Sequence, residues 1–332
     1  MVESVPDDVI AVASAHRRAL LGHCYRLLGS TFEAEDAVQE TFARAWSHRD
    51  RYDRDRGRLQ GWLFAIATNV CLDMLRGRQR RARAMDLGPA SHAGSALGEP
   101  LPERAWVLPM PDARVLAAGG DPSALVVERE HLRLAFIVAL QLLPPRQRAV
   151  LLLRDVLCFS AAEAADHLGT TVAAVNSALQ RARAVMRDSD DPPEVLRPDD
   201  GVQSDLLIRY CDAFARQDVD AMLTVIHEDA TMEMPPFAWW LRGRREITTA
   251  LRAPDASCAG ARLVPCAVNG SPAFWQTRPS GPSGSHEPFG LVVLGMFEGR
   301  IISITNFLDA ARLLPLFDRF GADESSVAAS YS

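Results

Sequence analysis

The stretch from residue 143 to 187 constrains the fold most, because it predicts three helices separated by two short breaks. Apolar residues recur with helical spacing over residues 150–157, and Ser160 followed by Glu163 is typical of a capping box that opens the second helix. That short helix ends at Gly169, a residue favoured in the left-handed conformation at helix C-termini. Two helices joined by a tight glycine-containing turn form a helix-turn-helix.

The third helix of this stretch has the surface of a DNA-reading helix. The N-terminal half of such a helix meets base edges in the major groove. Residues 172–187 contain three arginines and no acidic residue. Amide side chains can bond bases, and arginines can bond guanine or phosphates. The candidate residues are Asn176, Ser177, Gln180, Arg181, Arg183 and Arg187. A three-helix segment with a solvated arginine face is the alternative, and the alanine-rich preceding helix and acid-free third helix favour DNA binding.

Composition sets wider bounds on the chain. Its 332 residues predict two or three domains. The net charge of −6 suits a DNA-binding protein only if basic residues are segregated, and residues 51–83 hold nine arginines against three aspartates. All 36 basic residues are arginines, so coding bias also contributes to arginine use. The six cysteines lack CxxC or Cys/His metal-ligand spacing, which predicts reduced thiols in a cytoplasm, no metal and no cofactor. The sequence has no signal-like start and no 18-residue apolar run, so no membrane association is expected.

A first domain of three helices is predicted over residues 7–83. The helix at 16–28 ends at Gly29, and Ser30 with Glu33 opens the next helix. That second helix has a regular apolar stripe and an acidic exposed face. The third helix, residues 60–76, continues into the arginine-rich run RGRQRRAR.

Three segments of the chain together resemble an extracytoplasmic-function (ECF) RNA polymerase sigma factor. They are AEDAVQETFARAW (34–46), GWLFAIATNVCLDMLRGRQRR (61–81) and the helix-turn-helix (144–187), in the order of the family's regions 2.2, 2.3–2.4 and 4. The resemblance implies two partners: promoter DNA, and core RNA polymerase through the clamp of the β′ subunit and the flap of the β subunit. It assigns polymerase binding to Asp36, Gln39 and Glu40, and −10 recognition and melting to Asn69, Asp73, Arg76, Arg78, Arg80 and Arg81. A solvated helix face is the alternative for the acidic residues.

Two connecting segments are predicted from proline, glycine and acidic content. Residues 84–127 lack periodicity, which predicts a flexible, extended or disordered linker. As a coil this linker spans roughly 35–40 Å and fully stretched over about 100 Å, whereas −10 and −35 elements lie roughly 50–70 Å apart, so it can reach. Family analogy places it near the polymerase active centre, and a passive tether is the alternative. The helix-turn-helix domain follows at 128–187, and residues 188–202 form an acidic linker.

A third domain is predicted over residues 203–321, with a tail at 322–332. Helices are followed by strand candidates, with a hairpin turn at Gly299–Arg300. The runs HEDATMEMPPFAWWLRGRREI (227–247) and FEGRIISITNFLDA resemble a SnoaL-like, nuclear-transport-factor-like domain. The expected fold class is therefore multidomain: two all-α sigma domains followed by an α+β cone with a curved antiparallel sheet.

Cone folds of this kind usually enclose a pocket. The candidate lining residues are Met234, Trp239, Trp240, His286 and Phe307, and the alternative is that the aromatic residues fill the core. His227, Glu228, Asp229, Glu233 and His286 are the obvious acid/base candidates, but the sequence brings no two of them together, so no catalysis is assigned. A small-molecule ligand and an anti-sigma protein both stay open as further partners.

The sequence thus predicts a sigma factor whose C-terminal domain regulates its activity. A one-component, ligand-responsive DNA-binding regulator is the alternative, and an enzyme with an incidental DNA-binding fusion is a third class. The regulator needs neither the acidic helix face nor the Trp62–Arg83 melting segment, and the enzyme needs an acid/base pair that the sequence does not supply.

Overall fold

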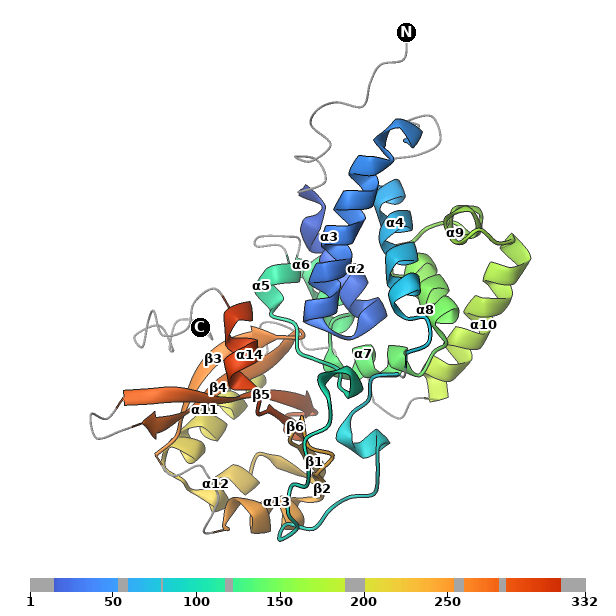
Figure 1. The fold of residues 1–332 in the computed structure, drawn as a ribbon. Helices are drawn as coiled ribbons and strands as arrows, with labels where there is room; N and C mark the ends of the chain where they lie inside the picture. Colours follow the sequence, from blue (N-terminus) through green and yellow to red (C-terminus); the bar gives the residue numbers. More distant parts are fainter. Residues whose placement is uncertain are drawn as a thin grey trace. The chain divides into compact units, whose positions relative to one another are not determined.

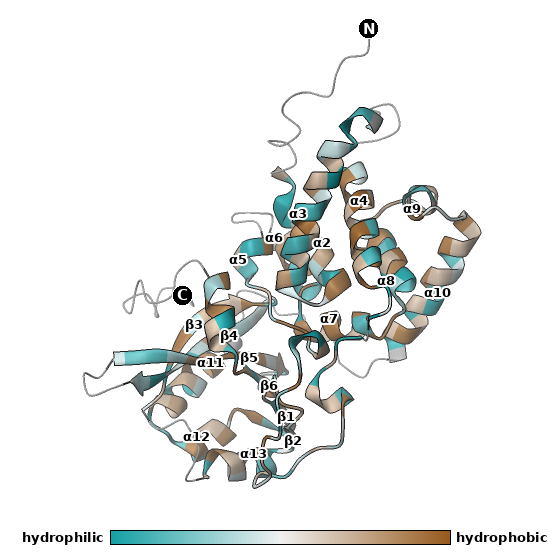
Figure 2. Ribbon diagram, viewed as in Figure 1, coloured by the Kyte–Doolittle hydropathy of each residue, from teal (hydrophilic) through white to brown (hydrophobic). Residues whose placement is uncertain are grey.

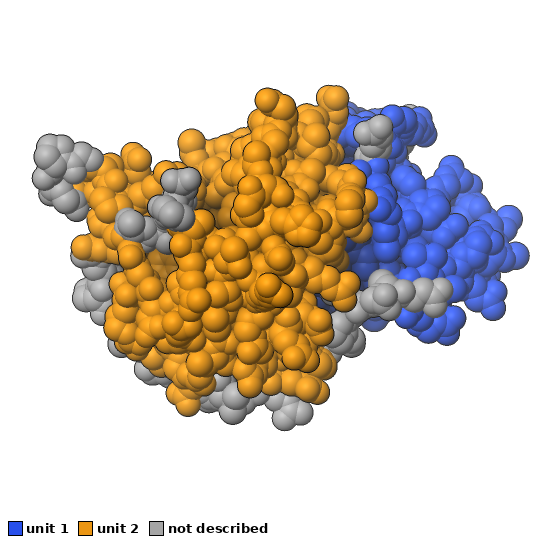
Figure 3. Space-filling view, turned by 90° about the horizontal axis from the view of Figure 1, so that it is seen from below, with its two compact units in different colours: residues 1–81, 107–191 blue, residues 82–106, 192–332 orange. Residues whose placement is uncertain are grey.

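The computed structural model describes residues 15–52, 59–78, 80–116, 122–188, 201–253, 260–280 and 285–317. The chain divides into two compact units (Figures 1 and 3). Unit 1 comprises residues 1–81 and 107–191, and unit 2 comprises residues 82–106 and 192–332. The chain therefore leaves unit 1 after Arg81, returns to it at Val107, and leaves it again after Asp191.

The first helical domain of unit 1 begins and ends its helices where the sequence signals predict. Its elements are α2 (Arg17–Leu28), α3 (Thr31–Ser47), the 3₁₀ turn η1 (Arg49–Arg51) and α4 (Leu59–Met74). Gly29 ends α2 in the left-handed conformation with φ 68°, and its N–H donates to the Tyr25 carbonyl at 2.7 Å. The Ser30 hydroxyl accepts from the Glu33 N–H at 3.4 Å, which caps α3.

The helix-turn-helix domain of unit 1 is confirmed. Its elements are α6 (Pro122–Glu130), α7 (Leu134–Gln141), α8 (Pro145–Leu151), the π-helical turn η5 (Leu152–Val156), α9 (Ala161–Leu168) and α10 (Val172–Asp188). Ser160 and Glu163 form the predicted capping box at the start of α9. Gly169 ends α9 with φ 58°, which produces the tight turn into α10.

The two helical domains of unit 1 share one hydrophobic core. Leu28 and Phe64 of the first domain belong to the same buried cluster as Ile137 and Leu151 of the second. Arg148 of α8 is buried and donates to the Leu27 carbonyl of α2, as well as to Gln141 and the Leu143 carbonyl of its own domain. In this structure the domains are therefore packed together as one body rather than held apart.

The segment that we predicted as a flexible linker has regular structure. It carries η3 (Ala84–Asp86), η4 (Glu103–Ala105), α5 (Asp112–Val115) and α6, while residues 117–121 lie outside the described part of the chain. The Tyr25 hydroxyl donates to the Leu108 carbonyl at 2.8 Å, and Met110 is fully buried. For its described residues the expected disorder is wrong, because the run of large apolar side chains from Trp106 to Met110 buries enough surface to fix the backbone.

Unit 2 is built on a six-stranded sheet with the order β2-β1-β6-β5-β4-β3. The strands are β1 (Ile226–Glu233), β2 (Trp240–Arg242), β3 (Arg262–Val268), β4 (Ser271–Ser280), β5 (Ser285–Phe297) and β6 (Arg300–Phe307). The helices are α11 (Gly201–Ala215), α12 (Val219–Leu223), α13 (Arg244–Leu251), α14 (Ala310–Leu313) and the 3₁₀ turn η6 (Leu314–Leu316). Side chains of α11, α12 and α13 pack with one sheet face into a second hydrophobic core.

Two details of the sheet differ from the sequence prediction. The expected antiparallel sheet is mixed, because β1 and β6 pair in parallel. Their connection runs through the whole remaining sheet, and a long crossover of this kind permits parallel pairing. The hairpin between β5 and β6 turns at Glu298 and Gly299, with φ 47° and 69°, rather than at Gly299–Arg300. Two positive φ values are typical of a type I′ turn, which matches the twist of the flanking strands.

Candidate nucleic-acid interface

Helix α10 has one buried apolar face and one exposed polar face. Val175, Leu179 and Ala182 are buried against the rest of the domain, so the opposite side of the helix faces solvent. This alternation is visible along α10 in Figure 2. The exposed candidates are Asn176, Ser177, Gln180, Arg181, Arg183 and Arg187. Within the described residues, no hydrogen bond or ion pair engages the side chains of the amide residues or Arg181, so these groups are available to a ligand.

Arg183 differs from the other exposed residues of α10. Its guanidinium forms two hydrogen bonds with the Asp155 carboxylate of η5, at 2.9 and 2.6 Å. These bonds raise the pKa of Arg183 above its usual value. The Arg183 side chain, one of the predicted DNA contacts, therefore braces α10 against η5.

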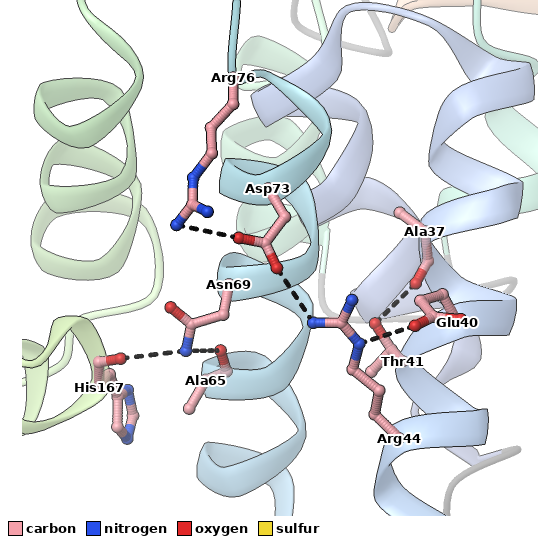
Figure 4. A network of polar contacts seen from close by, with 9 residues as sticks. All are labelled: Ala37, Glu40, Thr41, Arg44, Ala65, Asn69, Asp73, Arg76 and His167. Carbon is pink, nitrogen blue, oxygen red and sulfur yellow. Dashed lines mark hydrogen bonds and ion pairs between the residues drawn. The ribbon is translucent and has the colours of Figure 1, made fainter.

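A polar network covers the exposed face of α4, as Figure 4 shows. Asp73 accepts from Arg44 through Oδ2 and from Arg76 through Oδ1, both at 3.2 Å. Arg44 also donates to Glu40 at 2.7 Å. The carboxylates of Glu40 and Asp73 raise the pKa of Arg44 through these hydrogen bonds. The network joins Glu40, predicted for polymerase binding, to Asp73 and Arg76, both predicted for the −10 element.

Arg44 was not among our predicted site residues. It lies one helical turn after Glu40, and an acidic residue followed by arginine at i+4 is a favourable helix pair, so this part of the network had a sequence signal. The bond from Arg44 to Asp73 joins two helices and had none.

Asn69 lies on α4 one turn before Asp73, as predicted, but its amide is engaged. The Asn69 Nδ2 donates to the Ala65 carbonyl at 3.0 Å and to the His167 carbonyl of α9 at 3.3 Å (Figure 4). The helix-turn-helix domain thus contacts the residue that we predicted to recognise the −10 element.

The arginines that follow α4 divide into exposed and buried side chains. Arg76 and Arg80 are exposed, and Arg78 is exposed but paired with Glu33. Arg81 is only 5 % exposed and forms an ion pair with Glu33 at 2.9 Å. An arginine that contacts DNA is expected to be exposed. Arg81 instead lies in the packed part of the first helical domain.

The acidic face of α3 is narrower than the sequence suggests. Asp36, Gln39 and Glu40 are exposed, as predicted for a docking surface. Glu35, in contrast, forms ion pairs with Arg17 and Arg114. With Glu33 and Glu40 also paired to arginines, Asp36 is the predicted docking carboxylate for which no ion pair is seen among the described residues.

The five residues predicted to line one pocket of unit 2 lie on different faces of the sheet. Glu233 pairs with Trp240 and Met232 with Leu241, so Trp240 points away from the side where Met232 meets the helices. Phe307 shares the face of Thr305, which pairs with Glu233. Trp239 and Met234 pack in the helix-covered core, and His286 bonds Thr277 at 3.1 Å. The prediction of one pocket lined by all five residues is therefore wrong.

The sheet face that carries Glu233 and Trp240 is covered by residues 82–106. The Ala84 N–H donates to Glu233 Oε2 at 3.0 Å, and the Thr305 hydroxyl donates to Oε1 at 2.9 Å. Burial raises the pKa of Glu233, which is 3 % exposed, and Arg83 and these hydrogen bonds act in the opposite direction. The Trp240 indole donates to the Gly88 carbonyl at 3.0 Å.

Further contacts hold residues 82–106 along β1, β2 and α13, where Figure 1 shows their blue-green trace. The Leu101 N–H donates to the Pro236 carbonyl at 2.8 Å, and the Ala93 N–H donates to the Glu246 carboxylate at 2.9 Å. The Ala82 N–H donates to the Ala105 carbonyl at 2.8 Å, so the two ends of the segment lie side by side. We name residues 82–106 the docked segment.

Three protein-family models match the chain in the order expected from its fold. Sigma-70 region 2 matches residues 12–81, Sigma-70 region 4 matches residues 133–186, and the SnoaL-like domain matches residues 207–303. The first two ranges contain α4 and α10, and the third contains the sheet. This combination defines the class of protein as a sigma factor with a SnoaL-like C-terminal domain.

Relatives identify the branch of that class. The ECF RNA polymerase sigma factor SigG of Mycobacterium tuberculosis (strain ATCC 25618 / H37Rv) is 42 % identical over 323 residues, which cover 96 % of this chain and 85 % of SigG. The ECF sigma factor SigJ of the same strain is 31 % identical over 217 residues, covering 65 % of this chain and 62 % of SigJ. The chain belongs to the ECF RNA polymerase sigma factors.

A solved structure supports the fold of the described chain. The crystal structure of M. tuberculosis SigJ aligns with a TM-score of 0.60 at 21 % identity, covering 93 % of this chain and 100 % of that one. The predicted fold class, helical sigma domains followed by a SnoaL-like domain, is confirmed. Within the described part of the chain, no helix combines the length and apolar character needed to cross a membrane.

Proposed function

We propose that this chain binds core RNA polymerase in the cytoplasm and directs it to promoters, with α10 reading the −35 element and α4 the −10 element. The observation that carries the proposal is the exposed face of α10, where residues 172–187 hold no acidic residue and Asn176, Gln180 and Arg181 are exposed, in a chain that belongs to the ECF sigma factors. Asn176 and Gln180 offer amides to base edges, and Arg181 offers a guanidinium to guanine. Arg187, near the C-terminus of α10, suits a phosphate.

The −10 role rests on α4 and the arginines that follow it. Capture of unstacked bases needs side chains that bond base edges together with cationic groups for the phosphates. Asn69 and Asp73 can supply base contacts, and the exposed Arg76 and Arg80 can supply the cations. The Asp73 carboxylate becomes available to a base only when Arg44 or Arg76 releases it.

Docking on the polymerase is assigned to the exposed side of α3. Asp36 and Gln39 are exposed on one helix face, and no ion pair is seen for Asp36 among the described residues. We expect Asp36→Arg to lower the affinity for core polymerase by roughly 10-fold, because it reverses the charge of the proposed docking carboxylate. Arg18, which is exposed on α2, gives the control Arg18→Asp, which should leave this affinity unchanged.

The C-terminal domain is proposed to regulate initiation by retaining the docked segment. The same polypeptide carries both parts, so the sheet meets the segment at high effective concentration. Family resemblance places the corresponding linker inside the polymerase, and the segment cannot occupy both sites at once. The proposal needs no catalytic group in unit 2.

Run-off transcription with purified core polymerase tests the principal proposal. The full-length chain should support initiation at a specific promoter, and Arg181→Ala should reduce it while Arg216→Ala, at an exposed arginine just after α11, should not. A chain that binds promoter fragments but never associates with core polymerase would instead be the one-component regulator.

A substitution at Glu233 tests the regulatory proposal. Glu233→Ala removes the acceptor for the Ala84 N–H and the Thr305 hydroxyl, so the docked segment should become sensitive to limited proteolysis and initiation at limiting polymerase should rise. Glu228→Ala, an exposed acidic residue of the same strand, is the matched control. A released segment with unchanged initiation would contradict regulation by this contact.

A further inference from the structure

The first turn of α10 exposes apolar side chains at the end of the helix that meets base edges in a helix-turn-helix. Residues 171–174 are all exposed. Val172 is 43 % exposed, although Val175 and Leu179, which follow it at helical spacing, are 0 % and 7 % exposed. The apolar stripe of α10 therefore extends beyond the protein core at the N-terminal end of the helix.

The cap of α10 fixes this first turn. The Thr171 hydroxyl accepts from the Ala174 N–H at 3.2 Å, and the Thr171 carbonyl accepts from the Val175 N–H at 3.0 Å. The three positions after the cap are Val172, Ala173 and Ala174. Their side chains carry no hydrogen-bond donor or acceptor, so a partner meets only methyl groups there.

Val172 begins a row of exposed side chains along α10. Residues four apart are neighbours on a helix surface, and Val172, Asn176 and Gln180 follow one another at this interval. All three are exposed. At a rise of about 1.5 Å per residue the row measures roughly 12 Å, which is the length of about three to four base pairs of DNA. One apolar side chain therefore precedes two amides along the stretch of α10 that would follow the bases.

The chemistry of the major groove favours a different base at each end of this row. Each base pair presents hydrogen-bond donors and acceptors there, and thymine adds an apolar C5-methyl group. Amide side chains pair with adenine, whereas apolar side chains contact the thymine methyl. A polar base edge held against Val172 would lose water without gaining a hydrogen bond, but a thymine methyl would be buried favourably.

We propose that the first turn of α10 selects a thymine in the −35 element by burying its C5-methyl group against Val172. This inference rests on the proposed function of α10. The thymine belongs to a base pair beyond those that Asn176 and Gln180 read, on the side of the helix N-terminus. Ala173 and Ala174 add no polar group that would favour another base at this position.

Replacement of thymine by deoxyuridine tests this contact, because it removes the C5-methyl and leaves the hydrogen-bonding groups of the base unchanged. The full-length chain bound to core polymerase, the holoenzyme, first selects its −35 element from duplexes of random sequence. Each thymine of that element, on either strand, is then replaced singly by deoxyuridine, and the affinity is measured by competition. One replacement should weaken binding of the parent holoenzyme by roughly 4-fold, the effect expected for one buried methyl group.

Val172→Ala should remove this difference. The variant holoenzyme should bind the thymine and deoxyuridine duplexes with equal affinity at that position, because the methyl no longer has a side chain to pack against. The substitution lies at an exposed position, so it should leave the fold intact, and circular dichroism checks this. Val127→Ala, at an exposed valine of α6, is the matched control and should respond to deoxyuridine as the parent does.

The outcomes separate this inference from the proposed function. A selected element without thymine overturns the inference, as does a parent holoenzyme that tolerates deoxyuridine at every position. A sensitivity to deoxyuridine that Val172→Ala retains in full also overturns it, and a simultaneous loss of core polymerase affinity would assign the valine to a protein contact. A chain that selects no sequence together with core polymerase overturns the proposed function instead.

The position of the thymine gives a second test. Selection from random duplexes is repeated with Val172→Ala and with Gln180→Ala, and each variant should lose its preference at one base pair. These two base pairs should lie roughly three to four apart, because the helix rise sets the distance between the side chains. Loss of preference at the same base pair in both variants would contradict the inference.

Discussion

Helices α4 and α10 have parallel proposed roles but opposite states in this structure. The face of α10 is open, with its amides and Arg181 unengaged among the described residues. The face of α4 is engaged at each predicted position, since Asn69 bonds α9 and Asp73 bonds two arginines. The proposed duplex-reading side chains of α10 are therefore exposed in this structure, whereas the proposed base-reading side chains of α4 are already bonded within the chain.

If the two helices have their proposed roles, this difference predicts that α10 contacts the promoter before α4. A helix with an open face can sample duplex DNA at once, while a covered face contributes only after its cover has moved. The ion pair between Arg183 and Asp155 fits this order, because it fixes α10 within its own domain rather than against α4.

The largest change in stability is expected for a substitution at Arg148, whose side chain bonds both helical domains of unit 1. Burial lowers the pKa of Arg148 to about 10, so the side chain is still charged at neutral pH. Arg148→Ala leaves the carbonyls of Leu27 and Leu143 without their donor and opens a cavity, so we expect unfolding free energy to fall by about 3–5 kcal/mol. Urea unfolding measures this change. A loss no greater than that of Arg146→Ala, an exposed residue of the same helix, would refute it.

The second prediction contrasts the helices directly in DNA binding by the free chain. Arg181→Ala should weaken binding to a promoter duplex by about 1–3 kcal/mol, because it removes a base contact from an open face. Asn69→Ala should leave the same affinity unchanged, because its amide is already engaged by α9. Fluorescence anisotropy of a labelled duplex measures both. Equal losses in the two variants would show that α4 is as accessible as α10.

The third prediction concerns the buried side of α4. The His23 Nε2 lies 2.8 Å from the Thr68 hydroxyl, which itself donates to the Phe64 carbonyl, so the histidine is the donor. Burial lowers the pKa of His23 to about 3, so protonation favours the unfolded chain once the pH falls below about 6.5. Stability should therefore drop by about 1 kcal/mol between pH 7 and pH 5.5 from this group alone.

Denaturant unfolding at the two pH values measures this slope. His23→Gln keeps a donor to Thr68 without a titrating ring, so the slope should become smaller. His131, whose pKa burial lowers to about 4, should maintain a second contribution of the same sign. An unchanged slope in His23→Gln would count against the assignment.

The smallest effect is expected at the cap of α9. Ser160→Ala removes the acceptor for the Glu163 N–H and should cost about 1 kcal/mol of local stability. Amide hydrogen exchange at Ala164 and Ala165 should accelerate by roughly 5-fold. Ser177→Ala on α10, an exposed residue outside any cap, is the control, and identical exchange in the two variants would contradict the prediction.

Local signals predicted the helices of unit 1 well. Gly29, Ser30, Ser160 and Gly169 begin or end helices where expected, because capping depends on residues close in sequence. The apolar stripe of α10 likewise identified its exposed face. The contact between Asn69 and His167 joins residues 98 positions apart, and no pattern within either helix encodes it.

In unit 2, too, sequence patterns did not predict features that depend on pairing between distant segments. Strand candidates were identified from β-branched and aromatic runs, but β2 is three residues long and left too little periodicity to predict. The side of the sheet on which Trp240 lies depends on its register with Glu233. A one-residue shift would have placed Trp240 in the helix-covered core, so the candidate pocket could not be resolved without the pairing.

The bond between the Ala82 N–H and the Ala105 carbonyl limits how far apart the chain segments on either side of residues 82–106 can lie. While docked, 25 residues of chain begin and end within one hydrogen bond of each other, and so add almost nothing to the distance that their flanks can cover. Once freed and extended, the same residues measure roughly 80–90 Å. While residues 82–106 are held on the sheet of unit 2, that length of chain cannot add to the distance between α4 and α10.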